Sequence, residues 1–197
     1  MTNYEKIRRY KQAAAQDAAE RDYRSLNVFL AGPFIDIEKP ATDPDNNGSN
    51  AKKLRYHLYS SLEAKGHVVY LGEDVEMRVN GTANFGKYAN AVVYERHHLT
   101  NHNEAVIVLP DSPGSFCEIG DWASSPETCA GMLLLIDGTH EGKLNYINEG
   151  VVKFAKSNGA DVQYIDYANH AAAAKACEDH LMSVIHRLQV EELYGRK

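Results

Sequence analysis

The segment 109–120 holds the residues whose types and spacing are best suited to chemistry. It reads Leu-Pro-Asp-Ser-Pro-Gly-Ser-Phe-Cys-Glu-Ile-Gly and joins an apolar run to a predicted helix through a turn with proline and glycine. Ser115 is predicted to cap that helix, and Gly114 would let the backbone approach a ligand closely. The free amides of the first turn would then face a phosphate or another anionic oxygen.

Glu118 is expected in the first turn of the same helix, where the helix dipole favours an ionised carboxylate. Such a carboxylate can attack the anomeric carbon of a sugar, or stabilise an oxocarbenium-like cation as a base departs. The alternative is a glutamate that only balances the helix dipole or caps Ser115. The spacing alone leaves both interpretations open.

Two further acidic positions follow predicted strands. Asp111 ends a strand at the expected ligand edge, where it would hold a sugar hydroxyl or protonate a base; it is also typical of an Asx turn. Glu73 follows the second strand, in a loop that often touches a ribose in folds of this class. A solvated acidic loop is the alternative for Glu73.

Neighbouring histidines and a cysteine offer other chemistry. His98 and His102 are spaced i, i+4, which on a helix suits a metal or a proton shuttle. No His-Glu-x-x-His pattern accompanies them, so solvated histidines are favoured and no metal is expected. Cys117 adjoins the glutamate, but adjacent helical residues point about 100° apart. Cys117 is therefore predicted to face the core.

The elements that must position these residues form an alternating pattern. Strands are predicted at 27–31, 67–71, 105–109, 132–136 and 162–165; helices at 3–24, 50–66, 85–101, from about 115, 148–157 and 170–193; and polar loops at 36–50 and 72–84. Short apolar strands separated by helices indicate an α/β fold, a five-stranded parallel sheet covered on both faces. Right-handed crossovers make it a flavodoxin-like, doubly wound sandwich. Ligands should bind in the loops after Ala31, Leu71 and Leu109, beyond the carboxyl ends of the strands.

Two units are expected along the chain. Residues 1–24 form an N-terminal helix with a weak apolar stripe, which packs on the core or on a partner, and residues 25–197 form the α/β domain. The helix is a natural docking element for a regulatory partner.

Composition excludes several classes of protein. The 197 residues are 44% hydrophobic and 24% charged, values of a globular chain and not of a disordered one. No apolar run reaches the ~18 residues of a membrane span, and the polar start lacks a secretory core, so the expected location is cytoplasmic. Three cysteines without a C-x-x-C pair argue against a disulfide framework or zinc cage. A net charge of −6 without a basic cluster argues against binding duplex nucleic acid.

Cofactor motifs are missing as well. The chain has no G-x-x-x-x-G-K-[ST] phosphate loop. The turn Ala-Gly-Pro-Phe at 31–34 lacks the second and third glycines of a dinucleotide-binding fingerprint. No cofactor is expected.

Two motifs resemble a known family. Residues 28–34 (Val-Phe-Leu-Ala-Gly-Pro-Phe) resemble the first strand and turn of nucleoside 2-deoxyribosyltransferases, and 114–120 resembles their catalytic Gly-Ser-x-x-Glu-x-Gly segment. Residues 106–120 and 145–152 are similar to the deoxyribosyltransferase-like effectors of bacterial retron defence systems, which carry the same Ser-Pro-Gly-Ser-Phe run. The similarity spans about 27–167.

The resemblance implies roles for particular residues. Glu118 would be the nucleophile that forms a glycosyl-enzyme, and Phe29, Gly32 and Phe34 would line the base and sugar pocket. Asn148 would contact the sugar 5′ hydroxyl, often from a neighbouring subunit, which implies a homo-oligomer.

Two positions differ from the transferases. Ser112 stands where they carry an aspartate six residues before the glutamate, with the acid one place earlier at Asp111. His98 stands where they carry a base-handling aspartate before a Leu-Thr pair. These differences favour hydrolysis, or action on a larger nucleotide, over exchange of free bases.

The leading hypothesis is an N-glycosidic-bond enzyme, a hydrolase or deoxyribosyltransferase acting on a nucleoside, nucleotide or NAD-like substrate. Glu118 and Asp111 are its expected catalytic residues, and the substrate-binding set is Phe29, Gly32, Phe34, Glu73, His98, Gly114, Ser115 and Asn148. A phosphoribohydrolase is less favoured, because that family's paired-glycine motif is missing. The alternative is a partner-controlled, nucleotide-sensing or defence effector module without constitutive activity.

Overall fold

A five-stranded, all-parallel sheet forms the centre of the molecule. The computed structural model describes residues 3–22 and 24–195. The strand order is β2-β1-β3-β4-β5, which is the flavodoxin-like order and confirms the predicted fold class. The strands are β1 (Asn27–Ala31), β2 (Val68–Tyr70), β3 (Ala105–Val108), β4 (Met132–Asp137) and β5 (Asp161–Ile165). All five lie within a residue or so of their predicted positions.

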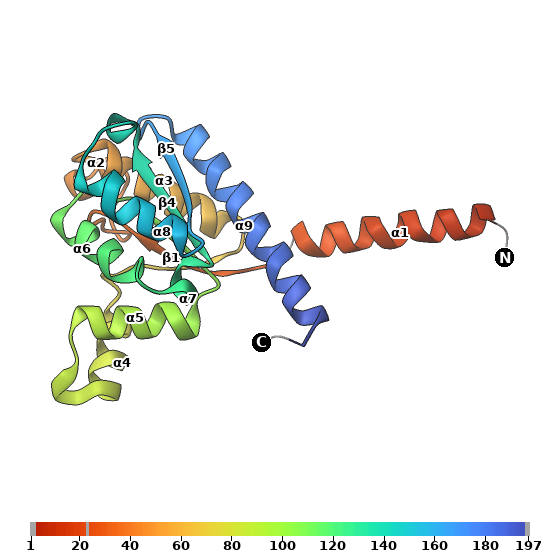
Figure 1. Cartoon of the computed structure of the whole chain (residues 1–197), viewed down its shortest axis with the longest axis horizontal. Coiled ribbons are helices and arrows are strands. Elements are labelled where there is room, and N and C mark those ends of the chain that lie inside the picture. The colour runs from red at the N-terminus through yellow and green to blue at the C-terminus, as the bar shows by residue number, and fades with distance from the viewer. Residues whose placement is uncertain (1–2, 23, 196–197) are drawn as a thin grey trace.

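Helices connect the strands (Figure 1). They are α1 (Asn3–Asp22), α2 (Pro44–Asn47), α3 (Asn50–Ala64), α4 (Val75–Phe85), α5 (Ala91–His102), α6 (Pro113–Trp122), α7 (Pro126–Cys129), α8 (Lys153–Ser157) and α9 (His170–Leu193), with the short helical segments η1 (Gly86–Tyr88), η2 (Gly138–His140) and η3 (Ile147–Val152). The predicted helix at 148–157 is divided between η3, a π-helical segment, and α8.

The prediction of a polar loop at 72–84 is wrong, because α4 occupies most of it. Its sequence reads as loop because Gly81 and two asparagines interrupt the apolar pattern. Gly81 has a packing reason: a Cβ there would lie 2.3 Å from the Cβ of Tyr94 on α5. A glycine normally read as a helix breaker thus permits two helices to touch. The predicted helix at 85–101 accordingly begins late, where Asn90 caps α5 by accepting from the amide of Val93.

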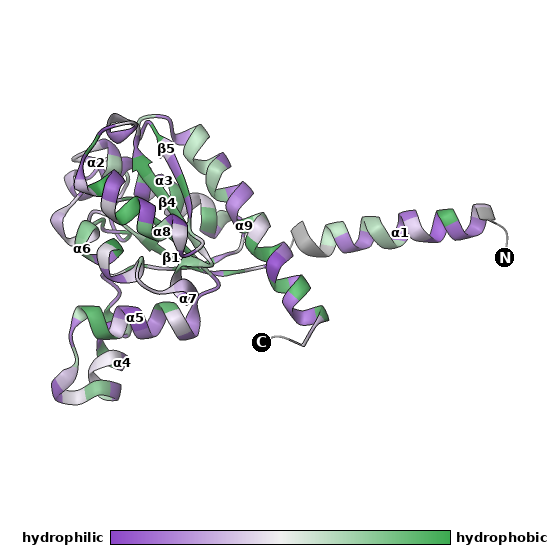
Figure 2. Cartoon of the chain, viewed as in Figure 1, coloured by the Kyte–Doolittle hydropathy of each residue, from purple (hydrophilic) through white to green (hydrophobic). Residues whose placement is uncertain are grey.

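Helices cover both faces of the sheet, and the strands between them are strongly apolar (Figure 2). On one face α3 and α9 pack against alternate strand residues such as Leu30 and Ile107. On the other face α5, α6 and α8 pack against Phe29, Val108 and their neighbours. Because strand side chains alternate between two covered faces, both faces of β1, β3 and β4 are apolar at all but their terminal positions.

Two parts stand apart from this sandwich in Figure 1: α1 projects away beyond α9, and α4 lies below α5, outside the main layers. Tyr4, Ile7 and Tyr10 of α1 are exposed by 76%, 56% and 80%. The described part of the chain has no helix long and apolar enough to cross a membrane.

Candidate functional site

A small cavity of about 200 Å³ opens at the carboxyl edge of the sheet. Segments that follow three strands meet there: the loop after β1, the loop after β2, and α6 after β3. Its lining residues are Phe29, Ala31, Gly32, Phe34, Arg55, Gly72, Glu73, Arg78, Glu95 and Glu118. The ligand edge predicted from the topology therefore contains a real concavity, with three carboxylates and two arginines around it.

A buried ion pair forms one wall of this cavity. Arg55, on α3, donates from Nη1 to Glu73 Oε1 at 2.7 Å and from Nη2 to Glu73 Oε2 at 3.0 Å. The arginine is 1% exposed, and its remaining donors bond to the carbonyl oxygens of Leu30 and Pro33. This geometry ties α3 to the ends of β1 and β2. Glu73, which was predicted to touch a ribose, lines the cavity, but both of its carboxylate oxygens accept hydrogen bonds from Arg55.

Glu118 reaches the cavity from α6, although the local helix differs from the prediction. Ser112, not Ser115, is the cap: its Oγ accepts from the Ser115 amide at 3.2 Å, and Ser115 Oγ accepts in return from the Ser112 amide at 3.0 Å. Since α6 begins at Pro113, Glu118 lies in the second turn, and the first turn holds no acidic residue. The expected stabilisation by the first-turn amides is therefore wrong.

The electrostatics of Glu118 also differ from the expectation that the helix dipole keeps it ionised. Burial raises the pKa of its carboxyl above the ordinary value; the positive charge of Arg55 opposes this rise and the negative charge of Glu73 adds to it. The charge that favours the ionised form of Glu118 is therefore that of an arginine from another helix, and it opposes the larger effect of burial.

Glu95, on α5, is the second titratable carboxyl of the cavity. It is 7% exposed. Burial, and then the negative charge of Glu118, raise its pKa from 4.5 to about 7, while Arg78 acts in the opposite direction. A Cβ at Gly72 would lie 3.3 Å from Glu95 Oε1, so a glycine in the loop after β2 leaves room for this carboxyl. The cavity therefore pairs two glutamates whose proton affinities differ.

The turn after β1 packs tightly against its neighbours, as its glycine implies. A Cβ at Gly32 would lie 3.0 Å from the carbonyl oxygen of Leu109 and 3.1 Å from Arg55 Cδ. Phe29 is buried and packs edge-on against Trp122, with ring centroids 5.7 Å apart. Phe34 is 52% exposed and forms part of the open rim. All three residues predicted from this turn line the cavity.

Three predicted residues of the segment 109–120 lie beside the cavity and not in its wall. Asp111 is exposed, and Ser49 Oγ donates to its Oδ2 at 3.4 Å. Ser115 is 1% exposed and spends its hydroxyl on the capping box. Gly114 is exposed, and a Cβ there would come within 4.0 Å of Glu118 Oε1. Of the two expected catalytic residues, only Glu118 reaches the cavity.

His98 lies on α5 but faces a different cavity, bounded by β2, α4 and α5. Its ring meets Tyr70 edge-on at 4.5 Å between centroids and lies 5.1 Å from that of His102. Burial, and then the charges of His102 and His97, lower the pKa of His98 to about 4. The imidazole is therefore neutral at physiological pH. Because His98 lines the other cavity, it does not border Glu95 or Glu118.

Asn148 is 9% exposed and all of its side-chain groups bond within its own chain. Its Nδ2 donates to the carbonyl oxygens of His140 and Lys143, both at 2.7 Å, and its Oδ1 accepts from the Tyr164 hydroxyl at 2.9 Å. These contacts hold the loop after β4 against β5. The role in a neighbouring subunit's site stays a prediction.

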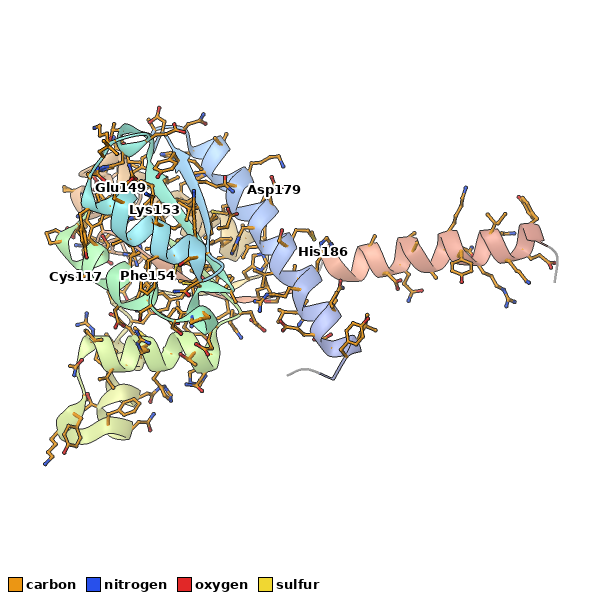
Figure 3. The ribbon with its side chains drawn as sticks, viewed as in Figure 1. Cys117, Glu149, Lys153, Phe154, Asp179 and His186 are labelled. Carbon is orange, nitrogen blue, oxygen red and sulfur yellow. The ribbon has the colours of Figure 1, made fainter. Side chains whose placement is uncertain are left out.

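The prediction that Cys117 faces the core is wrong: the thiol is exposed on the outer side of α6, as Figure 3 shows. The core positions of α6 are taken by Ile119 and Trp122. Among residues 3–22 and 24–195, no group of three His, Cys, Asp or Glu side chains is arranged to hold a metal ion.

Sequence reasoning missed three charged residues of the cavity: Arg55, Arg78 and Glu95. Two of them carried a signal. Arg55 interrupts the apolar stripe of α3, between Leu54 and Leu58, where only a paired charge would be tolerated. Glu95 precedes Leu99 by one helical turn, and these two are the buried residues of α5.

Comparison with known proteins identifies the family of this chain. The family model described as STM3845 retron effector protein matches residues 51–195, which is well over half of the chain and includes all five charged residues of the cavity. No curated protein matches. The retron link predicted from residues 106–120 and 145–152 is thereby confirmed. The chain belongs to the STM3845 retron effector protein family.

Proposed function

We propose that this retron effector cleaves the N-glycosidic bond of a nucleoside or nucleotide, with Glu118 as nucleophile and Glu95 as general acid. A Glu118 oxygen bonds to C1′ as the bond from C1′ to the base nitrogen breaks, and the base takes the proton of Glu95. Water then attacks C1′, returns a proton to Glu95, and releases both the sugar and Glu118. The sum is hydrolysis, with neither redox change nor cofactor.

The carrying observation is the pair of glutamates in one cavity with different proton affinities. A carboxyl with a pKa of about 7 is partly protonated at neutral pH and is suited to donate a proton. Burial also raises the pKa of Glu118, but the charge of Arg55 opposes that rise, and we therefore assign Glu118 the role of the ionised partner. This division of roles is the usual requirement for glycoside hydrolysis by two carboxyl groups.

A cavity of about 200 Å³ is smaller than the roughly 300–1,000 Å³ of sites that enclose a drug-sized ligand. It suits the sugar and the scissile bond, with the rest of the substrate extending past the exposed rim at Phe34. The ion pair between Arg55 and Glu73 keeps the two strand ends in place and is a positioning feature, since its groups are occupied by each other.

Membership of a retron effector family favours a second proposal, a module whose activity is released by a partner. The projecting helix α1, with Tyr4, Ile7 and Tyr10 exposed, is the docking element that we assign to such a partner. The two proposals differ in whether the isolated chain turns over substrate.

The test measures base release by mass spectrometry from ribo- and deoxyribonucleosides, their mono- and triphosphates, and NAD. The wild-type chain is compared with Glu118→Gln and with Glu141→Gln, a matched change at an exposed glutamate. Release by the wild type and Glu141→Gln, but not by folded Glu118→Gln, supports the enzyme. Equal release by all three contradicts the role of Glu118.

A silent chain is then tested in cells. Growth arrest on expression that Glu118→Gln relieves, and that Glu141→Gln does not, would support an activity present only in the cellular setting. Arrest that is independent of Glu118 would refute the glycosidic mechanism.

A further inference from the structure

A second and larger cavity, of about 510 Å³, lies between β2 and the helices α4 and α5. It shares no lining residue with the Glu118 cavity. Its volume falls within the range of pockets that enclose small organic ligands. None of its lining residues takes part in the proposed hydrolysis, so the kind of ligand it would bind follows from those residues alone.

Aromatic rings dominate one side of this cavity. Tyr70, Tyr94, His98 and His102 line it, and His98 is held edge-on by Tyr70. His98 Nε2 is buried and has no hydrogen-bond partner among the described residues. A buried polar atom normally has a partner. Because this nitrogen is shielded from solvent, a ligand's polar edge becomes its partner only when the His98 ring or a neighbouring side chain turns toward the cavity.

Amides and carboxylates make up much of the remaining wall. Asn80 and Asn84, one turn apart on α4, line the cavity, and so do Asp74 and Glu76. Of the described residues that line it, none is lysine or arginine. A phosphate would therefore meet negative charge, whereas a neutral ring with donors and acceptors on its edge would meet asparagine amides, which pair well with a purine.

We propose that this cavity binds a purine base, presented as a nucleoside, at a site separate from Glu118. The base stacks on the aromatic wall, its edge bonds to Asn80 and Asn84, and His98 Nε2 gains its missing partner.

The position of the cavity connects it to the catalytic proposal. On α5, Tyr94 lines this cavity and the adjacent Glu95 lines the Glu118 cavity. On α4, Met77 likewise lines this cavity, and the adjacent Arg78 lines the Glu118 cavity. A ligand that fixes α4 against α5 would therefore also fix Glu95 and Arg78. That consequence rests on the proposed function, but the binding itself does not.

Isothermal titration calorimetry with adenosine tests the binding, using Glu118→Gln protein so that the probe is not consumed. In that background, Asn80→Leu with Asn84→Leu should weaken adenosine binding at least tenfold. Thr82→Leu, an exposed change on the same helix outside the lining, is the matched control and should bind as the parent does. Ribose, which lacks a base, should not bind.

A second variant guards against loss of fold. His98→Phe keeps an aromatic ring against Tyr70 and Phe29 while removing Nε2, and it should also weaken binding, with an unchanged circular dichroism spectrum. Absence of adenosine binding, binding unaffected by these changes, or equal weakening by Thr82→Leu would overturn the proposal. None of these results depends on turnover, so the site and the proposed function fail separately.

Discussion

Replacing Glu95 by glutamine should make the protein more stable at alkaline pH. Burial and the charge of Glu118 raise the pKa of this carboxyl from 4.5 to about 7. The folded protein thus binds the proton more tightly than the unfolded chain, and stability is lost as pH rises from the unfolded value through 7. Glutamine is neutral throughout and escapes this loss.

The magnitude follows from the two pKa values. Ionising Glu95 in the fold disfavours the folded state by about 1 kcal/mol at pH 5 and by about 3 kcal/mol at pH 8. The stability of Glu95→Gln relative to wild type should therefore rise by about 2 kcal/mol between these pH values. The residue is 7% exposed, so little solvent screening reduces the effect.

Urea unfolding followed by the fluorescence of Trp122 measures this difference, since the chain has one tryptophan and it is 1% exposed. Base release should fall by about 10²–10⁴-fold in the same variant, because the leaving base loses its acid. A stability difference between the two proteins that is constant from pH 5 to pH 8 would refute the assigned environment of Glu95.

Other substitutions test the framework of the site. Gly81→Ala should open the contact between α4 and α5, because the new Cβ would lie 2.3 Å from the Cβ of Tyr94, and faster proteolytic cleavage within 75–102 would report this opening. Gly120→Ala has open space on α6, so it should instead raise the free energy of unfolding by about 0.5–1 kcal/mol, as measured by urea unfolding. Arg55→Met leaves its glutamate partner uncompensated and should destabilise by about 3–5 kcal/mol; a loss below 1 kcal/mol would contradict a buried pair. Removal of residues 1–22 should change the free energy of unfolding by less than about 1 kcal/mol, because no side chain of α1 whose burial is described, those of residues 4–19, belongs to the buried core. A larger loss would show that α1 packs on the domain.

The sheet could be predicted from sequence because its strands are short, apolar runs bounded by glycine, proline and aspartate. Strands β1, β3 and β4 are buried on both faces, which requires apolar residues along them, so each is visible in the sequence as a short apolar run. α9 was equally clear, because Cys177, Leu181, Val184 and Ile185 repeat at helical spacing. α4 was missed because Gly81 interrupts its apolar pattern, and the reason for that glycine is a tertiary contact with Tyr94 that no local pattern reveals.

The cavity was harder to predict than the sheet. Topology gave the edge, and Phe29, Gly32, Glu73 and Glu118 lie there, but the expected first-turn position of Glu118 depended on which serine caps α6. The N-cap of α6 is Ser112, three residues before the predicted Ser115. Local residue preferences do not distinguish the two positions, since serine is a good cap at either. Asp111, predicted from its place at the strand end, is exposed and accepts from Ser49 Oγ, outside the cavity wall.

The more general signal lies in charges placed where the pattern demands apolar residues. Arg55 sits within the buried stripe of α3 and Glu95 within that of α5, and neither would be tolerated there without a partner or a purpose. Arg55 has a partner in Glu73, and its charge also lowers the proton affinity of Glu118. Glu95 has no ion-pair partner among the described residues; burial and then Glu118 raise its proton affinity, and the charge of Arg78 opposes this only in part. The proposed cleavage of a glycosidic bond uses this contrast, with Glu118 as the carboxylate and Glu95 as the carboxylic acid.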